Sequence, residues 1–149
     1  MYQHIMLPFD GSELSLKAVH EGISLAKALG SRLTLITVVT PYHMGISSPI
    51  VSSLTRELEE RHEEESRKEA QKLHTEVVAR AKSDGVQCDS VVVMSDNPYA
   101  QIIENAATRK CDLIVMASHG RRGLDAVLLG SETVKVLTHS KIQVLVVRE

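Results

Sequence analysis

The stretch Asp112-Leu-Ile-Val-Met-Ala-Ser-His-Gly120 decides the fold, because it leads from a buried strand into a polar turn. Its uninterrupted apolar run predicts a strand over Asp112–Ala117 that is covered on both faces, which is typical of parallel sheets. The polar turn Ser118–Gly123 comes next. The pair Gly130-Ser131 then opens a predicted helix, and a last apolar strand is predicted over Ile142–Val147.

The glycine spacing in this stretch indicates an anion site. Gly120 and Gly130 bracket nine residues, and Ser131 follows directly. Glycine lets the backbone come close to a ligand, and a helix that opens on Gly-Ser presents N–H groups and a hydroxyl to an anion. We therefore predict a phosphate site at the carboxyl end of a parallel strand. The alternative is that Gly120 and Gly123 only form a tight turn and that Ser131 only caps a helix.

Upstream of this stretch, apolar runs alternate with segments of helical periodicity. The predicted strands and helices, in chain order, are His4–Phe9, Glu13–Leu29, Leu33–Val39, Leu54–Ser83, Val86–Met94 and Pro98–Thr108.

Further expectations concern the packing of the first two helices and the segment between the second strand and the second helix. Leu29 is assigned to the inward face of the first helix, by its helical spacing. Leu54 and Leu58 are expected to anchor the first, highly charged half of the long second helix, whose charged face is assigned to solvent. Tyr42–Ser53 is predicted to be a loop, either a lid or a plain connector.

This alternation predicts an α/β fold: a single doubly wound domain over residues 1–149, with a five-stranded parallel sheet in the order 3-2-1-4-5 and helices on both faces. Ligands bind such sheets at the carboxyl ends of the strands, where the strand order reverses. The reversal lies between the first and fourth strands. Asp10 and the turn that starts at Ala117 should therefore face each other across one crevice.

Composition excludes several classes of function. Lys and Arg number 17 against 19 Asp and Glu, and there is no Trp, so a nucleic-acid surface is not expected. Neither a Walker A motif nor a dinucleotide fingerprint is present. The start of the chain does not resemble a signal peptide, and no apolar run is long enough to span a membrane. Cys88 and Cys111 have no metal-site spacing, so a reducing, cytoplasmic location is expected.

These residues together resemble the nucleotide-binding branch of the universal stress proteins. The resemblance runs from Leu7-Pro-Phe-Asp-Gly-Ser12 to Val144-Leu-Val-Val147. The ATP signature of that family, Gly-x2-Gly-x9-Gly-Ser/Thr, reads here Ala117-Ser-His-Gly120, nine residues, then Gly130-Ser131. Only its first glycine is replaced, by Ala117.

The resemblance implies a role for each matching residue. Asp10 would recognise adenine or ribose, and Val38 would contact adenine through its backbone. Met116 and Ala117 would line the base and ribose. The phosphates of ATP, with Mg²⁺ if present, would be held by Gly120, Gly130, Ser131 and Glu132. Arg121 and Arg122 would neutralise phosphate charge or, alternatively, lie solvated at the surface.

The function predicted from the sequence is that of an ATP-binding, stress-responsive regulator that acts on a protein partner. An apolar terminal strand invites pairing at its edge, and the resemblance implies a homodimer through Ile142–Val147. Two alternatives stay open: a dimeric interaction protein without nucleotide, and a weak ATP hydrolase. Binding is favoured over turnover because only Asp10 and His119 are plausible catalytic groups.

Overall fold

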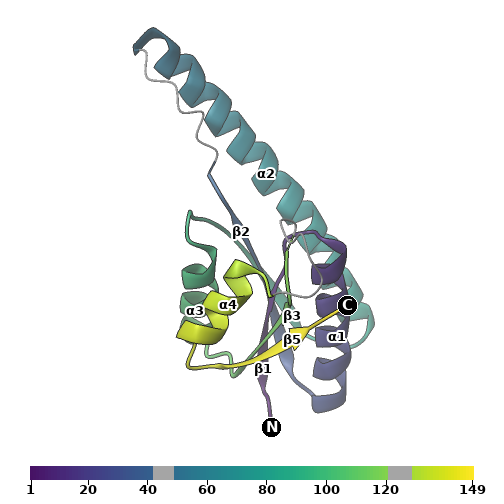
Figure 1. The fold of residues 1–149 in the computed structure, drawn as a ribbon. Helices are drawn as coiled ribbons and strands as arrows, with labels where there is room; N and C mark the ends of the chain where they lie inside the picture. Colours follow the sequence, from purple (N-terminus) through teal and green to yellow (C-terminus); the bar gives the residue numbers. More distant parts are fainter. Residues whose placement is uncertain (42–48, 121–128) are drawn as a thin grey trace.

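A computed structural model describes residues 1–41, 49–120 and 129–149 (Figure 1). The sheet has five strands, all parallel, in the order β3-β2-β1-β4-β5. The predicted fold class and strand order are therefore confirmed. The elements are β1 (His4–Pro8), α1 (Glu13–Leu29), β2 (Arg32–Val39), α2 (Pro49–Ser83), β3 (Cys88–Met94), α3 (Pro98–Thr108), β4 (Leu113–Ala117), α4 (Ser131–His139) and β5 (Gln143–Val147).

Helices cover both faces of the sheet, as Figure 1 shows. Alternate residues of the central strand β1 point to opposite faces. Ile5 and Leu7 join one core cluster with α1 and α2, whereas Met6 joins the other, to which α3 and α4 contribute Ile102 and Val136. The near-continuous apolar character of β1 and β4 is thus explained by burial on two sides.

The second helix differs from its prediction. It begins at Pro49 instead of Leu54, so the end of the predicted Tyr42–Ser53 loop is helical, while residues 42–48 lie outside the described chain. Proline suits a helix start because its fixed φ is helical and its missing N–H is not needed there.

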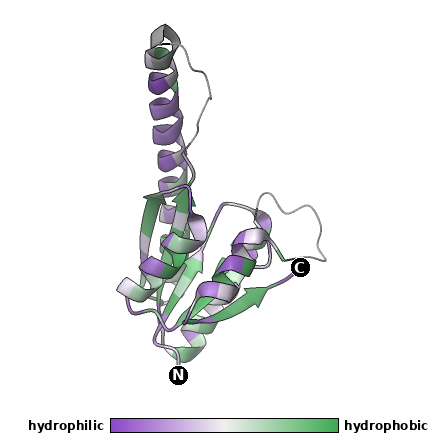
Figure 2. Cartoon of the chain, turned by 60° about the vertical axis from the view of Figure 1, so that its left-hand side comes forward, coloured by the Kyte–Doolittle hydropathy of each residue, from purple (hydrophilic) through white to green (hydrophobic). Residues whose placement is uncertain are grey.

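The packing predicted for three leucines was wrong. Leu54 is 61% exposed and Leu58 is 49% exposed. The reason is visible in Figures 1 and 2: the hydrophilic first half of α2 projects past the end of the sheet, so no core lies beneath it. Leu29 is 40% exposed, because it is the last residue of α1.

Two of the histidines in the described ranges are buried, and each is hydrogen-bonded to a threonine of β2. His4 Nε2 lies 2.8 Å from Thr34 Oγ1, and His74 Nε2 lies 2.6 Å from Thr37 Oγ1. Burial is the main cause that lowers the pKa of both imidazoles, that of His74 to about 4. Both side chains are therefore neutral at pH 7.

Gly22 generates a prediction about packing. A Cβ at this position of α1 would lie 2.3 Å from Leu7 Cδ2, and Leu7 is fully buried. Gly→Ala in a helix normally stabilises by about 1 kcal/mol, but overpacking a core costs about 1–3 kcal/mol. We expect Gly22→Ala to lower the free energy of unfolding, measured with urea. In a Leu7→Ala background the same change should become neutral or stabilising; a cost that persists there would contradict the clash.

The buried histidines generate a prediction about pH. In the unfolded chain the imidazole of His74 regains its ordinary pKa of 6.5, so between pH 6.5 and about 4 the unfolded state binds more protons than the folded state. The free energy of unfolding should therefore fall as the pH is lowered through this window. Between pH 7 and pH 5, His74 accounts for a loss of about 2 kcal/mol in the free energy of unfolding. Urea unfolding at both pH values should show a smaller loss for His74→Gln than for wild type, and equal losses would refute the assignment.

Candidate functional site

A cavity of about 580 Å³ opens at the carboxyl ends of β1, β2 and β4. This volume is in the range of small-molecule sites. All the site residues predicted from the sequence line it except Arg121 and Arg122, which lie outside the described residues. The lining set is Asp10, Val38, Met116, Ala117, Gly120, Gly130, Ser131 and Glu132. The cavity therefore lies at the predicted reversal of strand order.

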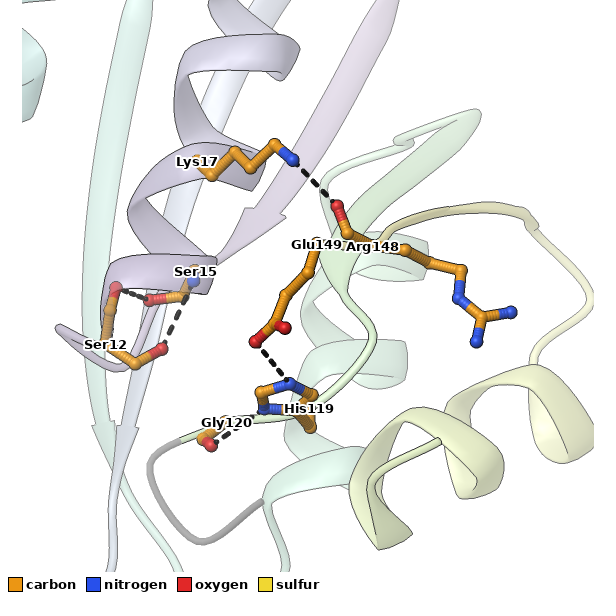
Figure 3. A network of polar contacts seen from close by, with 7 residues as sticks. All are labelled: Ser12, Ser15, Lys17, His119, Gly120, Arg148 and Glu149. Atoms are coloured by element: carbon orange, nitrogen blue, oxygen red, sulfur yellow. Dashed lines mark hydrogen bonds and ion pairs between the residues drawn. The ribbon is translucent and has the colours of Figure 1, made fainter. Parts of the chain in front are cut away.

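The end of β1 presents Asp10 to this cavity. Phe9 N still donates to Ile36 O of β2, at 2.8 Å, and the chain then turns at Gly11, whose φ is +82°. Ser12 N donates to Asp10 Oδ1 at 2.9 Å, and Ser12 in turn caps α1 through its hydroxyl (Figure 3). Asp10 is thus held by a turn whose positive φ favours glycine, with its side chain exposed to solvent.

Gly120 and Asp10 approach each other across the cavity. A Cβ at Gly120 would lie only 2.3 Å from Asp10 Oδ2. A side chain at position 120 would therefore displace the carboxylate. Asp10 and Gly120 were predicted to lie on opposite sides of one crevice. They approach each other closely because Gly120 has no side chain.

The start of α4 is fastened to the end of β4. Gly130 N donates to Ser118 O at 2.7 Å, and Thr133 Oγ1 donates to Ala117 O at 2.9 Å. A Cβ at Gly130 would lie 3.0 Å from His119 Cα, so glycine also allows these two backbones to pack. Within the described chain, no side-chain hydrogen bond caps this helix. Its first N–H groups, with the positive end of the helix dipole, are the part of the cavity that suits an anion.

Glu132 is engaged by its neighbours. Its Oε2 accepts a hydrogen bond from Tyr99 N at 2.8 Å, in the first turn of α3, and its Oε1 lies 3.3 Å from Lys135 Nζ. These contacts draw the carboxylate toward α3 and partly neutralise it. Like-charge repulsion toward an anion at Ser131 is reduced accordingly.

Ala117 stands where the family signature has glycine. Its side chain is buried and belongs to the core cluster on the α1 and α2 face of the sheet. The added methyl group is therefore accommodated by core packing, although the residue also lines the cavity.

The described lining of the cavity is acidic. It includes Asp10, Glu69, Asp96 and Glu132 and contains no lysine or arginine. Among residues 1–41, 49–120 and 129–149, no group of three side chains could hold a metal ion by itself. An anionic ligand would therefore have to bring a cation, or recruit one from outside the described lining.

Helix α2 forms a wall that the sequence reasoning missed. Ser66, Glu69, Ala70 and Leu73 line the cavity at helical spacing, on one side of α2. The charged half of this helix was assigned to solvent. The apolar pair Ala70 and Leu73 was a signal for a buried face, but its proximity to the strand ends depends on where α2 crosses the sheet.

His119 lies between the cavity turn and the last residues of the chain. Its Nε2 is 3.4 Å from Glu149 Oε1, and its Nδ1 is 3.4 Å from Gly120 O. Lys17 Nζ donates to Arg148 O at 2.9 Å, which fastens this segment to α1 (Figure 3). The Nε2 atom is buried, and no partner with hydrogen-bond geometry reaches it among the described residues.

None of the helices in the described ranges combines the length and apolarity needed to cross a membrane.

Known proteins are similar to this chain in sequence and in fold. Universal stress protein MJ0531 of Methanocaldococcus jannaschii is 32% identical over 151 residues, covering 100% of this chain and 84% of that protein. The solved structure of hypothetical protein MJ0577, from the same organism, superposes with a TM-score of 0.83 at 26% identity, over 100% of this chain and 97% of the other. A universal stress protein solved in complex with cAMP superposes with a TM-score of 0.70 at 26% identity, over 99% and 97%.

The sequence pattern of the universal stress protein family matches residues 1–148, almost the whole chain. The chain therefore belongs to the universal stress protein family.

Proposed function

We propose that this protein is a stress-responsive regulator that binds ATP, accompanied by Mg²⁺, in the cavity between β1 and β4. One observation carries the proposal: the uncapped start of α4 and the carboxylate of Asp10 face the same cavity of about 580 Å³. A nucleotide has an anionic end that suits the helix start and hydroxyl or amine donors that suit a carboxylate. A relative that is 26% identical was solved with cAMP, which supports an adenine nucleotide as the ligand.

In this proposal each lining residue has one task. The N–H groups of Gly120 and Ser131 hold phosphate, and Gly130 leaves room for it, because the N–H of Gly130 is already bonded to Ser118 O. Asp10 accepts a hydrogen bond from the ribose or base, and the Val38 backbone forms a hydrogen bond with adenine. Met116 and Ala117 provide the apolar surface beside base and ribose. Arg122 would add positive charge to the phosphate end.

Mg²⁺ is included in the proposal because the lining of the cavity is acidic. Four carboxylates, those of Asp10, Glu69, Asp96 and Glu132, are in the described lining. A polyphosphate placed among them is repelled unless its charge is reduced. Mg²⁺ binds largely through phosphate oxygens and waters, so it can arrive with ATP without a protein cage. Free Cys88 and Cys111 fit the reducing cytoplasm, where ATP is available.

The ATP site is tested by placing a negative charge at the helix start. Ser131 is exposed and lines the cavity, so Ser131→Asp should keep the fold and repel phosphate. We expect micromolar ATP affinity in the wild type by calorimetry with Mg²⁺, and a loss of about tenfold or more in the variant. Ser24→Asp, an exposed position of α1 outside the cavity lining, is the matched control.

Two results would count against this function. Equal ATP affinity in wild type and Ser131→Asp would place the binding elsewhere. Steady release of phosphate by the wild type, abolished by Asp10→Ala, would favour the weak hydrolase over the regulator.

We also propose a homodimer through β5. This strand lies at the edge of the sheet, and Leu145 is 42% exposed on it. Val134 and Leu137 of the adjacent helix α4 are 44% and 41% exposed. An apolar edge strand flanked by exposed apolar side chains is a surface that pairs with another strand.

The dimer is tested at the backbone of Val146. Val147 O accepts from Ser118 N, so the polar groups of Val147 face β4 and those of Val146 face the open edge. Val146→Pro removes an edge donor and spares the ladder to β4, and edge strands tolerate proline. Light scattering should show a dimer for wild type and Val146→Ala, and a folded monomer for Val146→Pro. A dimeric proline variant would exclude this interface.

A further inference from the structure

A chain of hydrogen bonds links helix α2 to the ends of β1 and β2. His74 Nε2 lies 2.6 Å from Thr37 Oγ1, and Thr37 Oγ1 donates to Phe9 O at 2.5 Å. His74 is only 2% exposed, and its ring lies 6.3 Å from that of Phe9. One buried side chain of α2 is thereby connected to two neighbouring strands.

The direction of each bond follows from counting protons. The carbonyl of Phe9 can only accept, so it takes the single hydroxyl proton of Thr37. The Thr37 oxygen must then accept from His74 Nε2–H. Nδ1 of His74 is therefore unprotonated; it is buried and has no hydrogen-bond partner among the described residues. Burial lowers the pKa of His74 to about 4, so this arrangement persists at neutral pH.

These bonds begin where the backbone ladder ends. The pairing of β1 with β2 reaches Pro8 and Ile36, and Phe9 N to Ile36 O follows at 2.8 Å. Beyond this bond, the next hydrogen bond between the two segments is made by the Thr37 side chain. Phe9 immediately precedes Asp10 and Thr37 immediately precedes Val38. All four residues line the cavity, so the link lies in the cavity wall beside Asp10 and Val38, whereas His74 is not among the lining residues.

We propose that His74 and Thr37 are a positioning pair that sets the separation of Asp10 from Val38, and with it the affinity of the cavity for the adenosine part of a nucleotide. The inference rests on the proposed function. The pair acts on the adenosine end only, because the start of α4 is fastened separately, by Ser118 O and Ala117 O. Phosphate binding should therefore be independent of it.

The chain contains a matched control for this pair. His4 and Thr34 form the same kind of buried bond, at 2.8 Å, three residues earlier on β2 and away from the cavity lining. His4 Nδ1 lies 3.0 Å from Arg109 O, so it also bridges two elements. Thr34→Val and Thr37→Val remove equivalent hydroxyls from one strand while keeping its β-branched shape.

The experiment measures ATP and inorganic tripolyphosphate binding by calorimetry in wild type and both variants, with stability followed by urea unfolding. We expect both substitutions to lower stability. Thr37→Val should weaken ATP binding by about tenfold, the equivalent of about one hydrogen bond. Thr34→Val should change it by less than about twofold, and tripolyphosphate affinity should stay within about twofold in both.

A second pair of variants separates positioning from general damage. His74→Gln keeps an N–H donor for Thr37, whereas His74→Leu does not. ATP affinity should therefore be closer to wild type in the glutamine variant.

The outcomes distinguish this inference from the function on which it rests. A wild type that does not bind ATP overturns both. A wild type that binds ATP, with a Thr37→Val variant that binds it equally well, overturns only the positioning role. Equal losses in Thr37→Val and Thr34→Val, or parallel losses for ATP and tripolyphosphate, assign the effect to destabilisation and also overturn it.

Discussion

The central position of β1, between parallel neighbours β2 and β4, is the constraint on which the cavity depends. The connection from β1 crosses to β2 over one face through α1, whereas β4 is followed by α4 on the other face (Figure 1). The connections therefore diverge from the carboxyl ends of β1 and β4, and the space between them stays open. Asp10 borders that space on one side, and Gly120 and Gly130 border it on the other.

Successive turns of helix α2, counted back from its carboxyl end, contribute first to the hydrophobic core and then to the cavity lining. Val77 and Ala81 pack in the core beneath the sheet, His74 reaches the strand ends, and Ser66 and Glu69 line the cavity beyond them. Each turn of a straight helix advances about 5.4 Å along the axis. Because α2 continues past the carboxyl ends of the strands, its next turns lie beside the cavity that opens there. This explains why a charged segment contributes to a ligand-sized cavity.

The fold was predictable because its signals are local. The apolar runs of β1 and β4 and the helix start at Gly130-Ser131 are each encoded within a few residues. The packing of Leu29, Leu54 and Leu58 was not predictable, since helical spacing says which side chains share a face but not how far the sheet extends beneath it.

By itself the sequence determined the doubly wound parallel sheet, its strand order and the convergence of Asp10 with the Gly120 turn, because periodicity and the handedness of crossovers restrict the topology. Only the tertiary structure decided the contacts between elements far apart in the chain. Glu132 bonds to Tyr99, and Thr37 bonds to His74 and Phe9. Such bonds depend on the distances and angles at which whole helices and strands pack, which residue spacing within one segment does not encode.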